Sequence, residues 1–225
     1  MQTEQEIQDF AKAIISFADS CTINKQGKEK EQSESVPSLT NITSSLQFIS
    51  KQIWNNNACK SVTKIPKLLQ SLSALSRFNV CTHIDLDVDQ QRLEVRSGSR
   101  LCLGHIQHYG DEQIQTELVN KGYGRVICIQ FCTAGGVGEE KDKEICYLLF
   151  YISMFLIGLH EGRNDYQPSF QPLPLLARNT EEQMEEEGAN EEMEAQMINK
   201  GYDGNIKNWA KKAKATTLNR FIHNN

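Results

Sequence analysis

The chain has 225 residues, of which 39% are hydrophobic and 24% are charged, and this composition excludes disorder along its whole length. The net charge of −5 excludes a global attraction to nucleic acid or to an anionic membrane, so neither is expected as a partner. Only five prolines occur among many Leu, Ile, Ala, Gln, Glu and Lys residues, which favours helix.

Seven cysteines occur at irregular spacings, and none of them forms a Cys-x-x-Cys motif. A chain of this length and apolar content is not a small scaffold held by disulfides. We therefore interpret the cysteines as reduced thiols in a cytoplasmic protein. The first residues carry acids where a targeting peptide would carry bases, so no targeting peptide is expected.

Apolar residues at helical spacing predict the first part of the fold. Residues 1–23 form an N-terminal helix, and the polar residues 24–37 form a loop. Residues 38–163 form a helical-repeat core, in which the Ser38 hydroxyl can cap the first helix. A later helix is predicted to begin near Pro66, because the missing N–H of proline costs nothing in a first helical turn.

Residues 80–96 fit two structures. Apolar residues alternate with Asp85, Asp87 and Asp89, which predicts a short extended piece, whereas the run from Asp89 to His108 also fits a helix weakened by glycines. We favour the extended piece followed by a helix. Further along the chain, Gly122 is predicted to end a helix as its C′ residue.

Residues Ile145 to Leu159 form the most apolar run of the chain. A bilayer needs about 20 such residues, so this run is predicted to be the central helix of a soluble core, with membrane anchoring as the alternative. Residues 164–180 contain Pro168, Pro172 and Pro174 and are predicted to form a linker. Residues 181–225 then form a C-terminal helical repeat or tail.

Two tracts repeat the string Asn-Lys-Gly-Tyr at an offset of 79 residues, in residues 111–124 and 190–203. The first tract continues into apolar Val126, Ile127 and Ile129, and the second continues into a helical pattern with small residues at Ala210 and Ala213. Both tracts resemble armadillo repeats. This resemblance implies an all-α, right-handed stack of helix pairs and triplets, an armadillo-like α-solenoid. In that family, Trp and Asn on third helices line a ligand groove, and Trp209 and Asn219 are of the matching types.

The chain carries one candidate metal set, in which a Cys-x-His step is followed by Cys-x-x-His. This is not a common spacing for a structural site, so buried cysteines beside surface histidines are the favoured interpretation. A metal-dependent enzyme or metal protein is the alternative. The set consists of Cys81, His83, Cys102, His105 and His108.

The C-terminal tail has opposite charges at its two ends. Eight glutamates lie in residues 181–194, whereas residues 205–225 contain lysine and arginine but no acid. Pairing of the acidic and basic helices is the favoured interpretation, and binding of an acidic protein surface is the alternative. The bases are Lys207, Lys211, Lys212, Lys214 and Arg220.

These patterns predict a non-catalytic scaffold or adaptor that binds protein partners through a helical surface. No cofactor is expected. The 34 Asn and Gln residues suggest a subunit of a larger, cytoskeletal or ciliary assembly.

Overall fold

The computed structural model describes residues 2–25, 38–56, 58–78, 86–132, 142–166 and 168–218. Every regular element within these ranges is a helix, which confirms the predicted all-α class. The chain divides into an N-terminal unit, Met1–Gly110, and a C-terminal unit, Asp111–Asn225. The division at Gly110 falls inside the stretch 38–163, which was predicted as one core.

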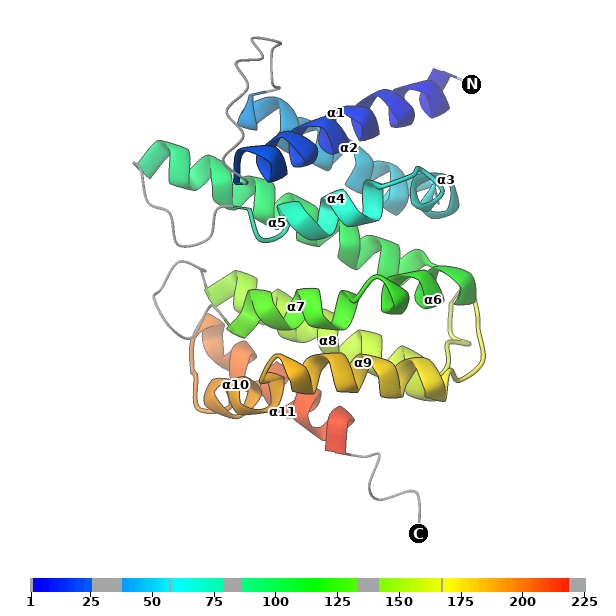
Figure 1. Ribbon diagram of the computed structural model, residues 1–225. Coiled ribbons are helices and arrows are strands. Elements are labelled where there is room, and N and C mark those ends of the chain that lie inside the picture. Colours follow the sequence, from blue (N-terminus) through cyan, green and yellow to red (C-terminus); the bar gives the residue numbers. More distant parts are fainter. Residues whose placement is uncertain are drawn as a thin grey trace. The chain divides into compact units, whose positions relative to one another are not determined.

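The N-terminal unit is a helical bundle in which α2 lies along α5 and α1 covers both α2 and α4 (Figure 1). Large aliphatic side chains fill its interior, among them the fully buried Ile14, Leu46 and Leu72. The described helices of this unit are α1 Gln2–Lys25, α2 Leu39–Asn56, α3 Cys59–Thr63, α4 Leu68–Leu75 and α5 Leu86–Tyr109.

Helix starts in the N-terminal unit follow local chemistry. The backbone N–H of Asn41 donates to Ser38 Oγ at 3.3 Å, so the predicted cap of α2 is confirmed. The helix expected near Pro66 begins at Leu68, because Lys67 adopts a left-handed backbone with a φ of 67°.

The extended interpretation is wrong for residues 86–89, because they form the first turn of α5, whereas the helix expected to follow them is confirmed. Residues 79–85 lie outside the described part of the chain. Asp87 and Asp89 stand in the first turn of α5, where carboxylates stabilise the positive end of the helix dipole. The two aspartates whose spacing indicated a strand therefore stabilise the start of a helix.

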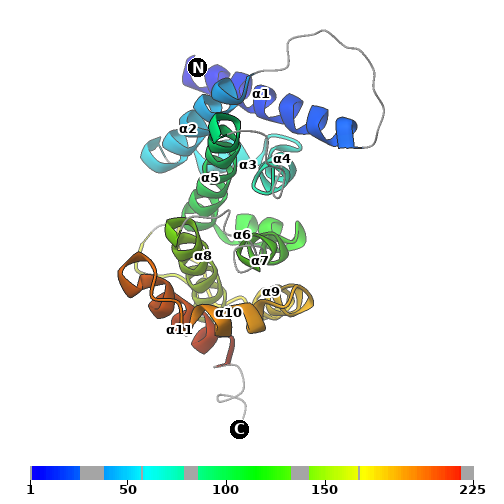
Figure 2. The same cartoon turned by 90° about the vertical axis from the view of Figure 1, so that its left-hand side faces the viewer.

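The C-terminal unit is built around α8, which lies between α11 on one side and α7 and α9 on the other (Figure 2). Leu149, Leu156 and Leu159 of α8 are fully buried. The described helices of this unit are α6 Glu112–Asn120, α7 Tyr123–Cys132, α8 Asp142–Glu161, α9 Pro174–Glu186, α10 Ala189–Gln196, the 3₁₀ helix η1 Tyr202–Gly204 and α11 Asn205–Leu218.

By length and composition, α8 is the one described helix that is long and apolar enough to cross a membrane, with a mean hydropathy of 1.4. Half of the most apolar 18-residue stretch of α8 is buried inside the unit. The central helix of a soluble core meets the same criterion.

The predicted linker is partly helical. Arg163 and Phe170 exchange two backbone hydrogen bonds, of 2.8 and 3.0 Å, and so close a short loop after α8. Pro174 then occupies the first turn of α9, where its missing N–H costs nothing. Residues 174–180 therefore belong to a helix and not to a linker.

The two Asn-Lys-Gly-Tyr strings have different structures. Gly122 has a φ of 74° and follows the end of α6, so its predicted role is confirmed, and Tyr123 is only 2% exposed. Gly201 instead has a φ of −59° with a ψ of 162°, and Tyr202 is 40% exposed. The sequence echo is therefore not a repeat of backbone conformation.

Gly124 allows α7 to approach α9 closely. A β-carbon at Gly124 would lie 2.9 Å from Thr180 Cγ2 and 3.1 Å from the Thr180 carbonyl oxygen. Alanine otherwise stabilises a helix by up to about 1 kcal/mol relative to glycine, so a loss of stability is diagnostic of this contact. We expect Gly124→Ala to lower the free energy of unfolding by about 1–3 kcal/mol, measured by urea denaturation.

Gly98→Ala is the matched control. Its added β-carbon would meet only the Leu46 side chain, at 3.2 Å, so the loss should be smaller. A Gly124→Ala protein as stable as the wild type would contradict the close approach.

Candidate functional site: an aromatic and basic strip on α8 and α11

Helix α11 presents opposite chemistry on its two faces. Ile206, Ala210 and Ala213 are fully buried, and the two alanines leave room for the neighbouring helices. Lys211 and Lys212 are exposed on the other face. Since residues 205–218 contain no acid, every charged residue on the exposed face of α11 is basic.

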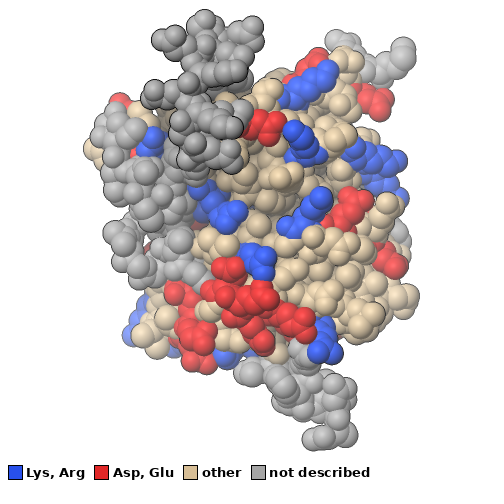
Figure 3. Space-filling model, viewed as in Figure 1, with Lys and Arg blue, Asp and Glu red and all other residues tan. Residues whose placement is uncertain are grey.

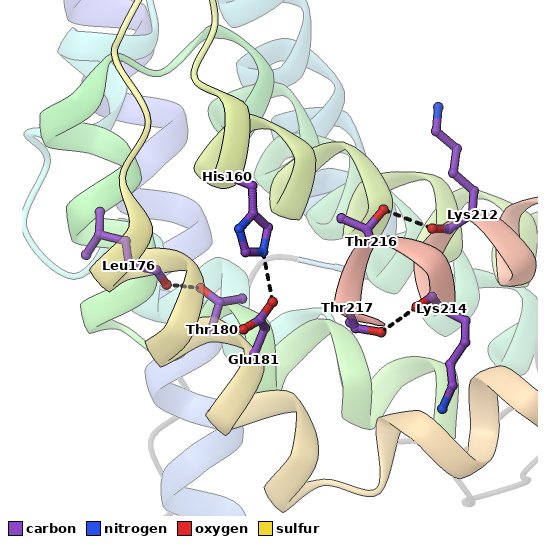
Figure 4. Close-up of polar contacts among 8 residues, drawn as sticks. All are labelled: His160, Leu176, Thr180, Glu181, Lys212, Lys214, Thr216 and Thr217. Carbon is purple, nitrogen blue, oxygen red and sulfur yellow. Dashed lines mark hydrogen bonds and ion pairs between the residues drawn. The ribbon is translucent and has the colours of Figure 1, made fainter. Parts of the chain in front are cut away.

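Among the described residues, the predicted pairing between the acidic and basic tail helices occurs through Lys214. Lys214 Nζ lies 2.9 Å from Glu194 Oε1 and 3.4 Å from Asn190 Oδ1, and both partners belong to α10. Lys212 extends from the opposite side of α11, away from Lys214 (Figure 4). Only one flank of α11 is therefore used for this internal pairing.

The other flank of α11 continues into a row of aromatic rings, which we call the aromatic strip. It consists of Tyr147, Phe150 and Tyr151 of α8 together with Trp209 of α11. Trp209 meets Phe150 edge-on at 4.9 Å between ring centroids, Phe150 lies 5.5 Å from Tyr151, and Tyr151 stacks on Tyr147 at 6.5 Å. Tyr147 is 42% exposed, and the other three rings are half-buried.

A lysine stands at each end of the aromatic strip. Lys143 Nζ lies 5.6 Å from the centre of the Tyr147 ring, and Lys212 Nζ lies 4.7 Å from the centre of the Trp209 ring. Cation–π contacts of this kind contribute about 0.5–1 kcal/mol at exposed positions. They keep both ammonium groups next to the rings while leaving them accessible to water.

Sequence reasoning found only the α11 half of this surface. Lys143, Tyr147, Phe150 and Tyr151 were missed because α8 is apolar nearly all round and shows no obvious face. The available signal was the spacing of four, seven and eight residues, which places one lysine and three aromatic residues along a single side of a helix.

Several of the glutamates that precede α11 join helices. Arg125 of α7 contacts Glu186 and lies 2.9 Å from Glu187 Oε1. Glu181 is buried, and His160 Nε2 of α8 lies 2.8 Å from its Oε1 (Figure 4). The remaining acids gather on the surface over α9 and α10 (Figure 3). This acidic face is separate from the aromatic strip on α8 and α11.

The candidate metal ligands that the structure describes do not converge. Cys102 Sγ donates to the Leu46 carbonyl oxygen at 3.3 Å, whereas His105 Nδ1 lies 3.2 Å from the Ser50 carbonyl oxygen. The ring of His108 packs edge-on against Tyr109. Within the described ranges, no three His, Cys, Asp or Glu side chains are placed to hold a metal ion.

Four predicted site residues lie outside the described part of the chain: Cys81, His83, Asn219 and Arg220. Lys207 lies half-buried on α11. No family model, curated protein or solved structure matches the chain. The armadillo resemblance therefore remains a prediction.

Burial makes His105 a source of pH-dependent stability. Burial lowers the pKa of His105, and the Ser50 carbonyl opposes this shift only in part. Below the unfolded-state pKa of about 6.5 the unfolded chain binds the proton more readily, so the stability from the neutral ring is present above that pH and is lost as the pH falls through it. We expect His105→Gln to reduce the fall in unfolding free energy between pH 7.5 and 5.5, measured by urea denaturation. An unchanged pH dependence would contradict this role.

Cys102 should be inert in the folded protein. Its side chain is 0% exposed, and burial raises its pKa to about 12. Since the thiolate is the reactive form, iodoacetamide at pH 8 should leave Cys102 unmodified while the half-buried Cys21 reacts. Peptide mass spectrometry with and without urea measures this difference. Equal labelling of both residues without urea would show that Cys102 is accessible.

Proposed function

We propose that this chain is a non-catalytic scaffold or adaptor, and that the aromatic strip is its main contact with a protein partner. The observation that carries the proposal is the connected row of four rings, in which Tyr147 is 42% exposed and Lys143 and Lys212 stand at the ends. Tyr and Trp supply most of the binding energy in many protein interfaces, because they bury a large area with few rotatable bonds.

The strip is held rigidly from beneath, which favours binding without a large ordering cost. Between Tyr147 and Phe150 on α8 lie Leu148 and Leu149, which are buried in the core of the unit. Trp209 is fixed by its edge contact with Phe150 and by the burial of Ala210 beside it. In this arrangement a partner buries preformed apolar area, and the lysines at the rim orient it.

The finer architecture and the setting belong to the same proposal. Two helix pairs of the C-terminal unit, α6 with α7 and α10 with α11, have at least one glycine between their helices, which is compatible with a right-handed armadillo-like stack. A subunit of this kind in a cytoplasmic assembly, such as one of the cytoskeleton or cilium, fits the Asn- and Gln-rich composition and the acidic net charge of the chain. The described residues offer no observation that favours the metal-dependent alternative.

Affinity purification from the native source tests this function. The bait is the full chain, as wild type and as Tyr147→Ser/Lys212→Glu, and washing is at high salt. We expect a protein that co-purifies with the wild type and is lost from the variant. With that protein purified, calorimetry should give a Kd at least about tenfold weaker for the variant, since a central aromatic contact is worth about 2 kcal/mol or more and tenfold corresponds to about 1.4 kcal/mol.

The control is Leu175→Ser/Lys121→Glu, which alters an exposed apolar residue and an exposed lysine of the same unit on elements other than α8 and α11. Leu175 is 76% exposed, more than Tyr147. The control should bind like the wild type. A partner that leaves the control and stays on the strip variant would refute the aromatic strip as the main contact.

A further inference from the structure

We infer that the aromatic strip takes an extended, acidic peptide segment whose carboxylates pair with the lysines and whose apolar side chain lies on the rings. The inference rests on the proposed function and specifies the chemistry of the partner. Three features support it: the sign of the charge around the strip, its length, and the position of the ammonium groups relative to the rings.

The charge around the strip selects an acidic partner. Lys143, Lys211 and Lys212 are exposed, and Lys214 is the described lysine of α11 that pairs with an internal acid, Glu194. The acids nearest in sequence, Asp142 and Glu144, stand in the first turn of α8, where the Asp142 carboxylate lies against Gly201. An acidic segment is repelled by the glutamates of α9 and α10 and attracted to α11, so the two faces direct it to one place.

The length of the strip fits a short extended segment. Gly201 lies against Asp142 and Trp209 against Phe150, so α11 runs in the same general direction as α8. At about 1.5 Å per residue, the path from Lys143 to Phe150 covers about 10 Å and the path from Trp209 to Lys212 about 5 Å. An extended chain spans this total of about 15 Å with four or five residues. Two carboxylates at that spacing can reach both lysines at once.

The lysines are placed to act together with the rings. An ammonium group has three N–H donors, so Lys212 can keep its contact with Trp209 and still donate to a carboxylate. Each exposed ion pair alone contributes little, so affinity requires the apolar contact as well. Single-stranded nucleic acid also uses lysines and rings, but the strip spans only two or three nucleotides, and the net charge of −5 disfavours a longer phosphate backbone.

Fluorescence anisotropy with the full chain tests the inference. The probe is the fluorescein-labelled peptide Glu-Glu-Ser-Leu-Ser-Glu-Glu at low salt. Lys143→Glu/Lys212→Glu should weaken binding at least about tenfold, whereas the control Lys51→Glu/Lys121→Glu, which alters two exposed lysines outside the strip, should stay within about twofold. Raising the salt concentration should weaken wild-type binding.

A second pair of measurements separates the rings from the charge. Tyr147→Ser should weaken binding of the leucine probe several-fold and should hardly affect binding of a probe with serine in place of leucine, as a double-mutant cycle requires for a direct contact. A lysine-for-glutamate probe should not bind. Equal effects of Tyr147→Ser on both acidic probes would overturn the ring contact.

Other outcomes would overturn the inference as a whole. These are absence of probe binding at millimolar chain concentration, tighter binding of a 15-nucleotide oligothymidine, or self-association of the chain that the Lys143→Glu/Lys212→Glu variant abolishes. If the probe fails to bind while Tyr147→Ser/Lys212→Glu still loses the co-purifying protein, the proposed function stands and only the acidic chemistry is refuted.

Discussion

The C-terminal unit depends on the burial of α8. A helix that is apolar nearly all round must be covered by neighbours on most sides, and α7, α9 and α11 provide that cover. The least covered side carries Tyr147, which is 42% exposed, together with the half-buried Phe150 and Tyr151. Tyrosine suits such a half-wet position, because its ring gains from burial while its hydroxyl stays hydrated. The aromatic strip is therefore the part of a largely buried helix that the described residues of the unit cover least.

Some charged side chains of the same unit form pairs between helices, and others remain exposed on its surface. Glu181 with His160, Glu187 with Arg125 and Glu194 with Lys214 each join two helices, and in the last two pairs a basic side chain balances the acid. The exposed lysines of α11 have no acid on their own helix to balance them. A chain that is acidic overall thus carries one basic face, and an approaching partner meets opposite signs on two sides of a small unit.

Local patterns predicted what depends on local chemistry. Ser38 and Gly122 act through their own backbone and hydroxyl groups, and both predictions hold. The failures arose where tertiary context decides. The alternating aspartates before residue 90 indicated a strand, but the packing of α5 against α2 makes residues 86–89 the start of a helix. Pro174 was assigned to a linker, although it stands in the first turn of α9. The spacing of the α8 rings places them on one side of the helix, but the sequence does not say which side of an apolar helix its neighbours leave partly exposed.

The repeated string Asn-Lys-Gly-Tyr shows how that context acts. In the first copy the ring of Tyr123 is buried edge-on against that of Phe155, with 5.0 Å between the ring centroids. Here α7 follows α6 directly after Gly122, which has a left-handed backbone. In the second copy α10 ends at Gln196, before the string begins, and Tyr202 stays exposed. The longer turn lets α11 start beside the first turn of α8 and run along it. The departure from the repeat is therefore what brings Trp209 against Phe150 and completes the aromatic strip.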